Sequence, residues 1–188
     1  MDIQLDKTKI CRYLGYTKQI VEEDIENLID EAIEKIKQTA NPRYIFEIFD
    51  IALTDFGVEV KSSSFKLSGR GVSNHLKGSN KCVFLGATLG VEVDSALRLL
   101  QMSSMTRAVI FDACADEYIE KVCDQAEAEI KTLGYRTTFR YSPGYKDFPI
   151  ENQRALLTLV NAQRIGLSCN ECFLLMPQKS VTAVIGLL

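Results

Sequence analysis

Hydrophobic positions recur with helical spacing in several parts of the chain. From Val21 to Thr39 they follow an i, i+3, i+4, i+7, i+11 pattern, which predicts an amphipathic helix. A second stripe runs from the pair Ser103-Ser104, either of which can cap it, to Leu133, and Gly134 ends it. A helix of about 29 residues is about 44 Å long, so it should cross the whole domain. Shorter helices are predicted over residues 5–16 and 92–102.

Short runs of aromatic, β-branched and other apolar residues predict strands early and late in the chain. The Gly-rich stretch 69–79 separates two of the early runs and is predicted as a loop or a short helix. Cys172–Met176 and Val181–Leu187 are predicted to form a closing hairpin around the turn 177–179. The other predicted strands span Arg43–Ile51, Phe56–Lys61, Phe65–Leu67 and Lys81–Ala87. Strands early and late with helices in the middle are typical of an α+β fold.

The stretch Thr137–Gln153 combines a strand, a sharp turn and the start of a helix. Alternation over Thr137–Tyr141 predicts the strand. Pro143 presets φ and Gly144 supplies a positive φ, which fits a type II turn. A helix is predicted to follow as far as about Arg164, with Asp147 near its N-cap, Pro149 in its first turn, and Ile150, Leu157 and Val160 on its buried stripe. Because Arg140 and Tyr145 flank this turn, the stretch is interpreted as a small-molecule site.

Composition adds limits to this picture. With 188 residues, 46% of them hydrophobic, the chain is predicted to form one domain over 1–188 that includes the N-terminal helices of 1–40. A net charge of −3 gives no electrostatic reason to expect nucleic acid or an anionic membrane as a partner. No apolar run approaches the roughly 20 residues of a membrane span. The N-terminus lacks a signal-peptide pattern, so the six cysteines are expected to be reduced and the protein cytoplasmic.

Two segments resemble a single protein family. Arg140-Tyr-Ser-Pro-Gly-Tyr145 resembles the Arg-x-x-x-Gly-Tyr segment of the S-adenosylmethionine-binding activation (reactivation) domain of cobalamin-dependent methionine synthase. The run CFLLMPQKSVTA, residues 172–183, resembles the Met-x-Pro-x-x-Ser-Val-Ser-Gly-type hairpin of the same domain. The resemblance covers most of the chain and is closer from about Thr88 onward. It implies an α+β fold in which a bent, mainly antiparallel sheet packs with long helices.

The resemblance also implies which residues contact the ligand. Arg140 would take the carboxylate of S-adenosylmethionine through paired hydrogen bonds, and Tyr145 would offer a hydroxyl and an electron-rich face near the sulfonium. Ser142 and Pro143 would form the turn, and Gly144 would leave its main chain open to the ligand. The family also uses an acidic contact, which this sequence does not locate. If Arg140 is held in an internal ion pair and no cavity lies beside Gly144, this proposal for the corner fails.

In the family, the domain presents S-adenosylmethionine to a cobalamin-binding module, and one-electron reduction, typically from a flavodoxin, is trapped by methyl transfer to cobalt. By this resemblance, the sequence is expected to correspond to the activation-domain region alone. The resemblance therefore implies a stand-alone reactivation partner for a cobalamin-dependent methionine synthase that lacks its own activation domain. The fused domain continues past the point matching Leu188, so further ligand contacts are expected to be missing. Such a chain would be an accessory part of a methyltransferase.

Two other functions stay open. The same fold would serve as a docking module for a corrinoid protein without using S-adenosylmethionine. A thiol redox protein would use Cys169 and Cys172, although a lone CxxC that precedes a strand fits neither a thioredoxin motif nor a complete zinc site. His75, the only histidine, is interpreted as a surface loop residue. The acidic residues of the long helix are interpreted as its solvated face: Asp112, Asp116, Glu117 and Glu120.

Overall fold

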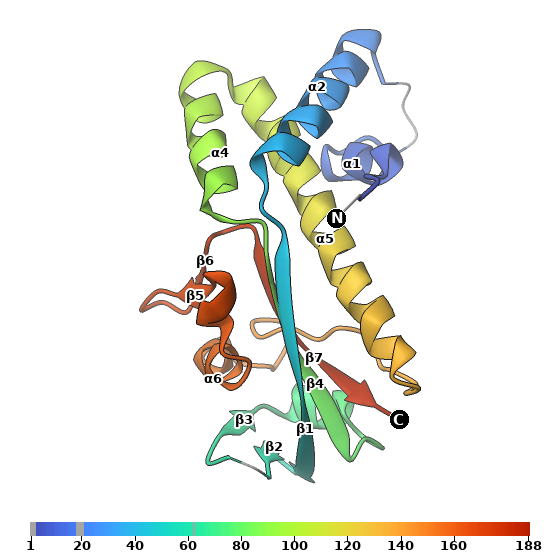
Figure 1. Cartoon of the computed structure of the whole chain (residues 1–188), viewed down its shortest axis with the longest axis vertical. Helices are drawn as coiled ribbons and strands as arrows, with labels where there is room; N and C mark the ends of the chain where they lie inside the picture. Colours follow the sequence, from blue (N-terminus) through green and yellow to red (C-terminus); the bar gives the residue numbers. More distant parts are fainter. Residues whose placement is uncertain (1–2, 18–20, 62) are drawn as a thin grey trace.

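A computed structural model describes residues 3–17, 21–61 and 63–188. Its centre is a five-stranded sheet of order β3-β2-β1-β4-β7, in which each neighbouring pair is antiparallel (Figure 1). The strands are β1 (Arg43–Thr54), β2 (Gly57–Val60), β3 (Lys66–Ser68), β4 (Lys81–Thr88) and β7 (Ser180–Leu187). The predicted α+β class with a mainly antiparallel sheet is confirmed.

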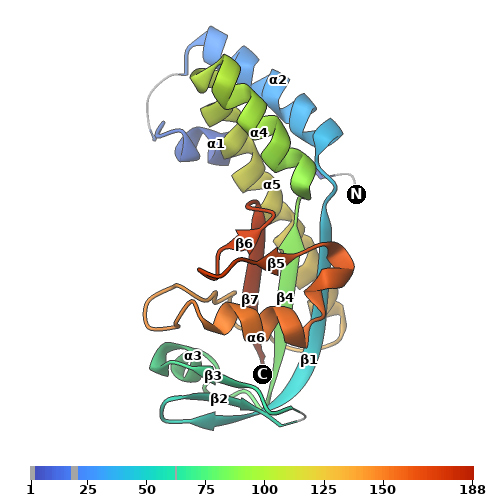
Figure 2. The ribbon, with the colours of Figure 1, turned by 90° about the vertical axis from the view of Figure 1, so that its left-hand side faces the viewer.

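Strand β1 gives the sheet its bend. Its first part, Arg43–Asp50, pairs with β4, and its last four residues, Ile51–Thr54, pair with β2. One long strand therefore belongs to two parts of the sheet, and its lower end turns toward β2 and β3 (Figure 2). The strand continues to Thr54, three residues beyond its predicted end.

The helices are concentrated at one end of the molecule and along one side. The long helix, α5, has 28 residues and begins after Ser104, whose hydroxyl accepts the Arg107 N–H at 3.4 Å. Gly134 follows it with φ +86, as predicted for its C-terminus. The helices are α1 (Lys7–Tyr13), α2 (Glu23–Thr39), α3 (Arg70–His75), α4 (Val91–Ser103), α5 (Met105–Thr132), α6 (Asn152–Leu159) and the 3-10 helix η1 (Ala162–Ile165).

The sheet is covered on both faces. Alternate residues of β4 point to opposite layers: Val83 packs with Ala126 of α5, whereas Phe84 packs with Leu156 of α6. Strand β4 is consequently apolar along most of its length, which is typical of a strand buried on both faces. Within the described part of the chain, no helix combines the length and the apolar character needed to cross a bilayer.

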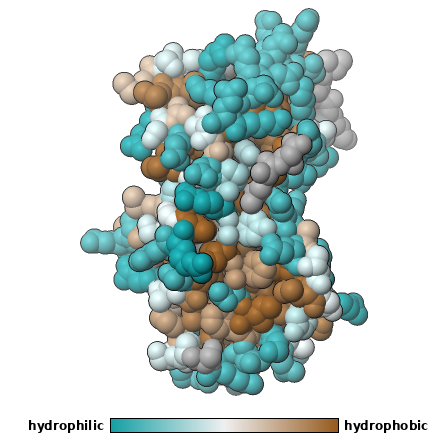
Figure 3. Space-filling view, viewed as in Figure 1, coloured by the Kyte–Doolittle hydropathy of each residue, from teal (hydrophilic) through white to brown (hydrophobic). Residues whose placement is uncertain are grey.

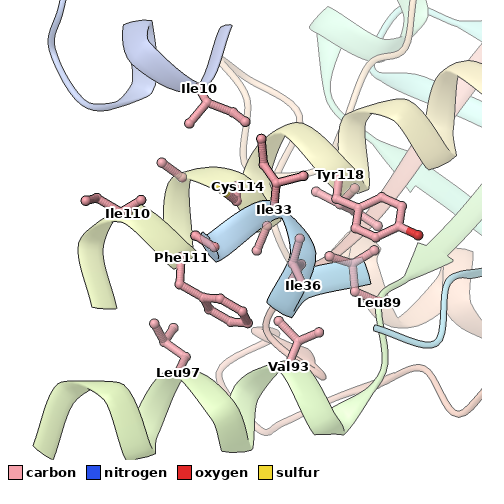
Figure 4. Packing of buried hydrophobic residues seen from close by; sticks show 14 of the residues in the cluster. Ile10, Ile33, Ile36, Leu89, Val93, Leu97, Ile110, Phe111, Cys114 and Tyr118 are labelled. Carbon is pink, nitrogen blue, oxygen red and sulfur yellow. The ribbon is translucent and has the colours of Figure 1, made fainter. Parts of the chain in front are cut away.

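A third hydrophobic cluster fills the helical end. Ile33 and Ile36 of α2 face Phe111 of α5, with Val93 and Leu97 of α4 closing the cluster (Figure 4). In the view of Figure 3 the molecule narrows between this helical end and the sheet, and hydrophobic residues gather over the sheet below the narrowing.

The predicted closing hairpin between Cys172–Met176 and Val181–Leu187 is wrong in its strand pairing. Strand β7 pairs with β4 over eight residues, and β6 (Leu175–Met176) pairs with β5 (Ser168–Cys169) instead. The predicted strand Cys172–Met176 begins inside a tight turn, where the Asn170 side chain accepts the N–H groups of Cys172 and Leu174. Only its last two residues are left to form β6.

The helix after Pro149 also differs from the prediction. It begins at Asn152 with Glu151 at its N-cap, so Asp147 does not cap it. It ends at Leu159 because Asn161 adopts a left-handed conformation with φ +52, and η1 follows as a separate turn. The Asn152 side chain donates to the Pro149 carbonyl at 2.8 Å and to the Ser68 carbonyl at 3.0 Å, which joins α6 to β3.

Candidate functional site

The turn at the predicted corner has the expected backbone. The Tyr145 N–H donates to the Ser142 carbonyl at 3.3 Å, and Gly144 has φ +87. This places Pro143 and Gly144 at the two central positions of a turn that requires positive φ at the second of them. The Gly144 N–H then donates to the Phe148 carbonyl at 2.7 Å, so this amide already has a partner.

The segment before the turn lies along the outer edge of β7. The Thr138 N–H donates to the Gly186 carbonyl at 3.0 Å, and Tyr141 and Val184 exchange two backbone hydrogen bonds. The pairing consists of two isolated bridges, at residues 137 and 141, so the predicted strand is present only as an irregular extended edge. This edge lies between α5 and α6, which pack against opposite faces of the sheet.

Arg140 points toward α5 and is held there by three carboxylates. Its Nη2 lies 2.7 Å from Glu120, and its Nη1 lies 3.1 Å from Asp124 and 2.9 Å from Glu127. Only 19% of the Arg140 side chain is exposed. Both terminal nitrogens are therefore engaged, and a ligand carboxylate would have to replace at least one of these partners.

Tyr145 lies on the other side of the edge segment. Its ring is 57% exposed and meets the Tyr141 ring edge-on, with the centroids 5.8 Å apart. Tyr141 is buried and stacks on Phe148, in the cluster beneath α3 and α6. The Lys146 ammonium lies 5.6 Å from the centroid of the Tyr145 ring, so an internal cation already approaches this ring. The structure therefore does not bring Arg140 and Tyr145 together on one face.

The turn lies at the surface, with Gly144 and Tyr145 exposed. A Cβ on Gly144 would make ordinary van der Waals contact with the Ile150 side chain, at 3.6 Å. Among the main surface cavities of the described residues, none is lined by residues 142–145. In this conformation the corner is closed. This conformation therefore meets both conditions under which the corner proposal fails, the internal ion pairs of Arg140 and the lack of a cavity beside Gly144. Ligand binding by Arg140, Ser142, Pro143, Gly144 and Tyr145 stays a prediction only for a corner that has rearranged.

The acidic residues of α5 are not simply a solvated face, and this prediction is corrected. Asp112 and Asp116 hold Lys179 at 2.9 and 2.6 Å, and Glu120 holds Arg140. Glu117 has no exposed surface at all. The spacing of residues 112, 116, 120 and 124 places their side chains in one row on a helix, and this was the signal in the sequence. The sequence did not reveal that the edge of the sheet would supply two cations to that row.

His75 is also placed differently from the prediction. It is the last residue of α3, and its ring lies 4.5 Å from that of Phe139 and 4.8 Å from that of Tyr141, centroid to centroid. Its Nε2 lies 3.0 Å from the Thr138 hydroxyl. Burial lowers the pKa of His75, and its hydrogen bond to the Phe139 backbone opposes that shift. The histidine therefore supports the edge segment from the α3 side.

The two cysteines of the CxxC motif lie on the β5–β6 hairpin, Cys169 half-buried in β5 and Cys172 exposed in the turn. Nowhere in residues 3–17, 21–61 and 63–188 do three or more His, Cys, Asp or Glu side chains gather as metal ligands would. The structure therefore adds no further ligand to this cysteine pair.

Comparison with known proteins gives a structural match. No family model matches the sequence, and no curated protein matches it. Among solved structures, the crystal structure of the MetH reactivation domain bound to AdoHcy superposes with a TM-score of 0.72 at 14% sequence identity. The match covers 97% of this chain and 73% of that one. The chain therefore has the fold of the MetH reactivation domain.

Proposed function

We propose that this chain binds S-adenosylmethionine at the edge segment beside β7 and supports reductive methylation of cob(II)alamin on a separate protein. One observation carries the proposal. A chain with the fold of a domain solved with AdoHcy has an Arg-x-x-x-Gly-Tyr segment at the edge of its sheet. The turn within that segment has the positive φ at Gly144 that the resemblance requires.

The charge of the site agrees with this ligand. Three carboxylates surround the single guanidinium of Arg140, so the cluster keeps an excess of negative charge. S-adenosylmethionine carries a carboxylate, an ammonium and a sulfonium. If Arg140 turns to the ligand carboxylate, the carboxylates that it leaves can receive the ligand cations. S-adenosylhomocysteine lacks the sulfonium charge, so we expect it to bind less tightly than S-adenosylmethionine, with a difference that decreases at high salt.

The partner in this proposal is a cobalamin-binding methionine synthase without its own activation domain, with a flavodoxin-type electron donor. Bound cobalamin would supply the reduced cobalt that accepts the methyl group. This chain would contribute the position and orientation of the methyl donor, since proximity alone can supply much of the acceleration.

Isothermal titration calorimetry tests the ligand. We expect saturable binding of S-adenosylmethionine to the unchanged chain and about tenfold or greater weakening in Arg140→Lys, which loses the paired geometry but keeps a cation facing the three carboxylates. Arg136→Lys, at an exposed arginine on the same segment, is the matched control and should bind normally. Equal affinity in Arg140→Lys would contradict the assignment of Arg140.

A second candidate is a docking module that recognises a corrinoid protein without S-adenosylmethionine. The closed corner favours it, because Arg140 is engaged and Gly144 packs on Ile150. Calorimetry separates the two, since no binding of S-adenosylmethionine at millimolar concentration selects the docking module. For the first candidate, methylcobalamin absorbance should appear only when chain, S-adenosylmethionine, reductant and cobalamin protein are all present.

A further inference from the structure

A cavity of about 620 Å³ lies between α4 and the β5–β6 hairpin, away from the Arg140 corner. We call it the α4–hairpin cavity. Its size falls within the range of small-molecule sites, roughly 300–1,000 Å³. The β5–β6 hairpin lies on the side of the sheet that carries α6 (Figure 2), whereas Arg140 is ion-paired with α5. The lining residues are Asp94, Leu97, Arg98, Gln101, Asn170, Leu174, Leu175, Met176 and Gln178.

The walls of this cavity are joined by Asp94. One carboxylate oxygen, Oδ2, accepts the Gln178 N–H at 2.9 Å, which connects the chain after β6 to the first turn of α4. The other oxygen, Oδ1, is buried and has no hydrogen-bond partner among the described residues. Asp94 therefore joins the two walls through one oxygen, and its negative charge remains beside the cavity.

Arg98 lines the cavity and carries a positive charge that no carboxylate of the described residues pairs with. It lies one turn after Asp94 on the same face of α4, and its Nε makes only a long hydrogen bond of 3.4 Å to the Asp94 carbonyl. In the part of the chain that the structure describes, Arg98 forms no ion pair, in contrast to Arg140 and Lys179. Its guanidinium can therefore donate paired hydrogen bonds to two oxygens of an anion such as a carboxylate or a sulfonate.

The rest of the lining suits an apolar body. Leu97 forms a buried part of the wall, while Leu174 and Met176 are 57% and 52% exposed. Large apolar side chains that are half exposed around a cavity gain free energy when a ligand covers them. The lining also includes the amide residues Gln101, Asn170 and Gln178, of which Asn170 already accepts two backbone N–H groups through its side-chain oxygen.

We propose that the α4–hairpin cavity binds a small organic monoanion, with Arg98 contacting its carboxylate or sulfonate and Leu97, Leu174 and Met176 contacting its apolar part. A dianion such as a phosphate ester is disfavoured, because the Asp94 carboxylate lies one helical turn away and repels a second negative charge. This site is distinct from the one proposed for S-adenosylmethionine and does not depend on it.

Two matched dyes test the proposal. The first, 8-anilinonaphthalene-1-sulfonate, is an aromatic monoanion, and N-phenyl-1-naphthylamine has the same rings without the sulfonate. Fluorescence titration of the full chain should show one saturable site for each dye. Arg98→Gln should weaken the sulfonate dye about tenfold and leave the neutral dye unchanged. Met176→Ser should weaken both. Arg12→Gln, at an exposed arginine on α1, is the control and should change neither.

Three results would overturn the site. The first is the absence of saturable binding by the sulfonate dye, and the second is equal affinity in Arg98→Gln. The third is an equal loss for both dyes in Arg98→Gln when the circular dichroism spectrum and the Tm of the variant are unchanged, which would show that Arg98 makes no charge contact with the sulfonate. Saturating S-adenosylhomocysteine should leave the affinity for the sulfonate dye unchanged, and competitive displacement would overturn the claim of a separate site. A chain that binds no S-adenosylmethionine but binds the sulfonate dye through Arg98 would reject the proposed function alone.

Discussion

Replacement of Glu117 should stabilise the protein. This residue lies in the middle of α5 beneath α1 and has no exposed surface. Neither carboxylate oxygen makes a well-formed hydrogen bond among the described residues, although the nearby Asp6 backbone N–H lowers the pKa of the acid. The nearest cations are the ammonium groups of Lys121 at 3.6 Å and Lys9 at 3.8 Å, on side chains that are 30% and 40% exposed. Burial raises the pKa of Glu117, and Lys9 opposes that shift.

The size of the stabilisation follows from the cost of burying the Glu117 carboxylate, which the ion pairs with Lys9 and Lys121 offset only in part. Replacement of every member of a buried ion pair by apolar side chains is neutral or stabilising by about 1–4 kcal/mol, whereas removal of one partner destabilises the fold when the other charge stays buried. Because both lysines are partly solvated and lie beyond hydrogen-bond distance, we expect Glu117→Met to increase the free energy of unfolding by about 1–2 kcal/mol near neutral pH. For a chain of this size, that corresponds to an increase in Tm of about 2–8 °C.

The stability gained by replacing Glu117 should increase as the pH rises. The folded-state pKa of Glu117 lies above the value of 4.5 for the free side chain. Its contribution to stability is therefore fully present below pH 4.5 and is lost as the pH rises through the folded pKa. Glu117→Gln resembles the protonated acid at every pH. Its stability relative to the unchanged protein should thus increase between pH 4.5 and pH 8.

Guanidinium denaturation at several pH values measures both effects. Glu34→Gln is the control, since the Glu34 side chain is 70% exposed, and a surface substitution should change stability by less than about 0.5 kcal/mol. If Glu117→Met is less stable than the unchanged protein at pH 8, the ion pairs with Lys9 and Lys121 outweigh the cost of burial. If the difference between Glu117→Gln and the unchanged protein is constant with pH, the pKa of Glu117 is not raised. Either result would refute the reasoning.

Two further predictions concern packing around the sheet. Gly57→Ala should cost about 1–3 kcal/mol, because a Cβ at this position would press against the backbone carbonyl of Leu67 in the paired strand β3; an unchanged midpoint in urea would contradict this contact. Gln153→Leu should cost about 1–3 kcal/mol, because it removes the 2.5 Å hydrogen bond to the buried Thr182 hydroxyl and leaves that hydroxyl unpaired. A double variant with Thr182→Val should recover part of that loss, and no recovery would show that the bond is not the cause.

Local patterns were enough to predict most of the helices and most of the strands. Helix α5 has a continuous apolar stripe, a serine at its start and a glycine after its end, and all three signals lie within the helix or beside it. Strand β4 is an apolar run that is buried whichever partner it has. The partner of β7 could not be predicted in this way. It lies across the sheet in β4, with Ser180 opposite Thr88, and sequence proximity favoured the nearer segment, Cys172–Met176.

For the candidate ligand site at the Arg140 corner, the sequence could name the residues but not their arrangement in space. The sequence indicated the turn and its positive φ at Gly144, because both depend on neighbouring residues. It could not indicate that α5 would lie opposite Arg140, since Glu120 and Glu127 come from a helix whose position is set by the packing of the whole sheet. The same limit applies to Tyr145, which could be assigned to the turn but not to the side of the edge segment on which it lies.

The row of carboxylates on α5 links the closed corner to the ligand that we propose. Asp112 and Asp116 hold Lys179, while Glu120, Asp124 and Glu127 hold Arg140. Five carboxylates thus face two cations, and the row has an excess of negative charge. Arg140 is released from this row only at the cost of its ion pairs, so an anion alone gains little by binding it. A ligand that brings a carboxylate together with two cations can exchange partners with the whole cluster, and this argues for S-adenosylmethionine over a simple carboxylate.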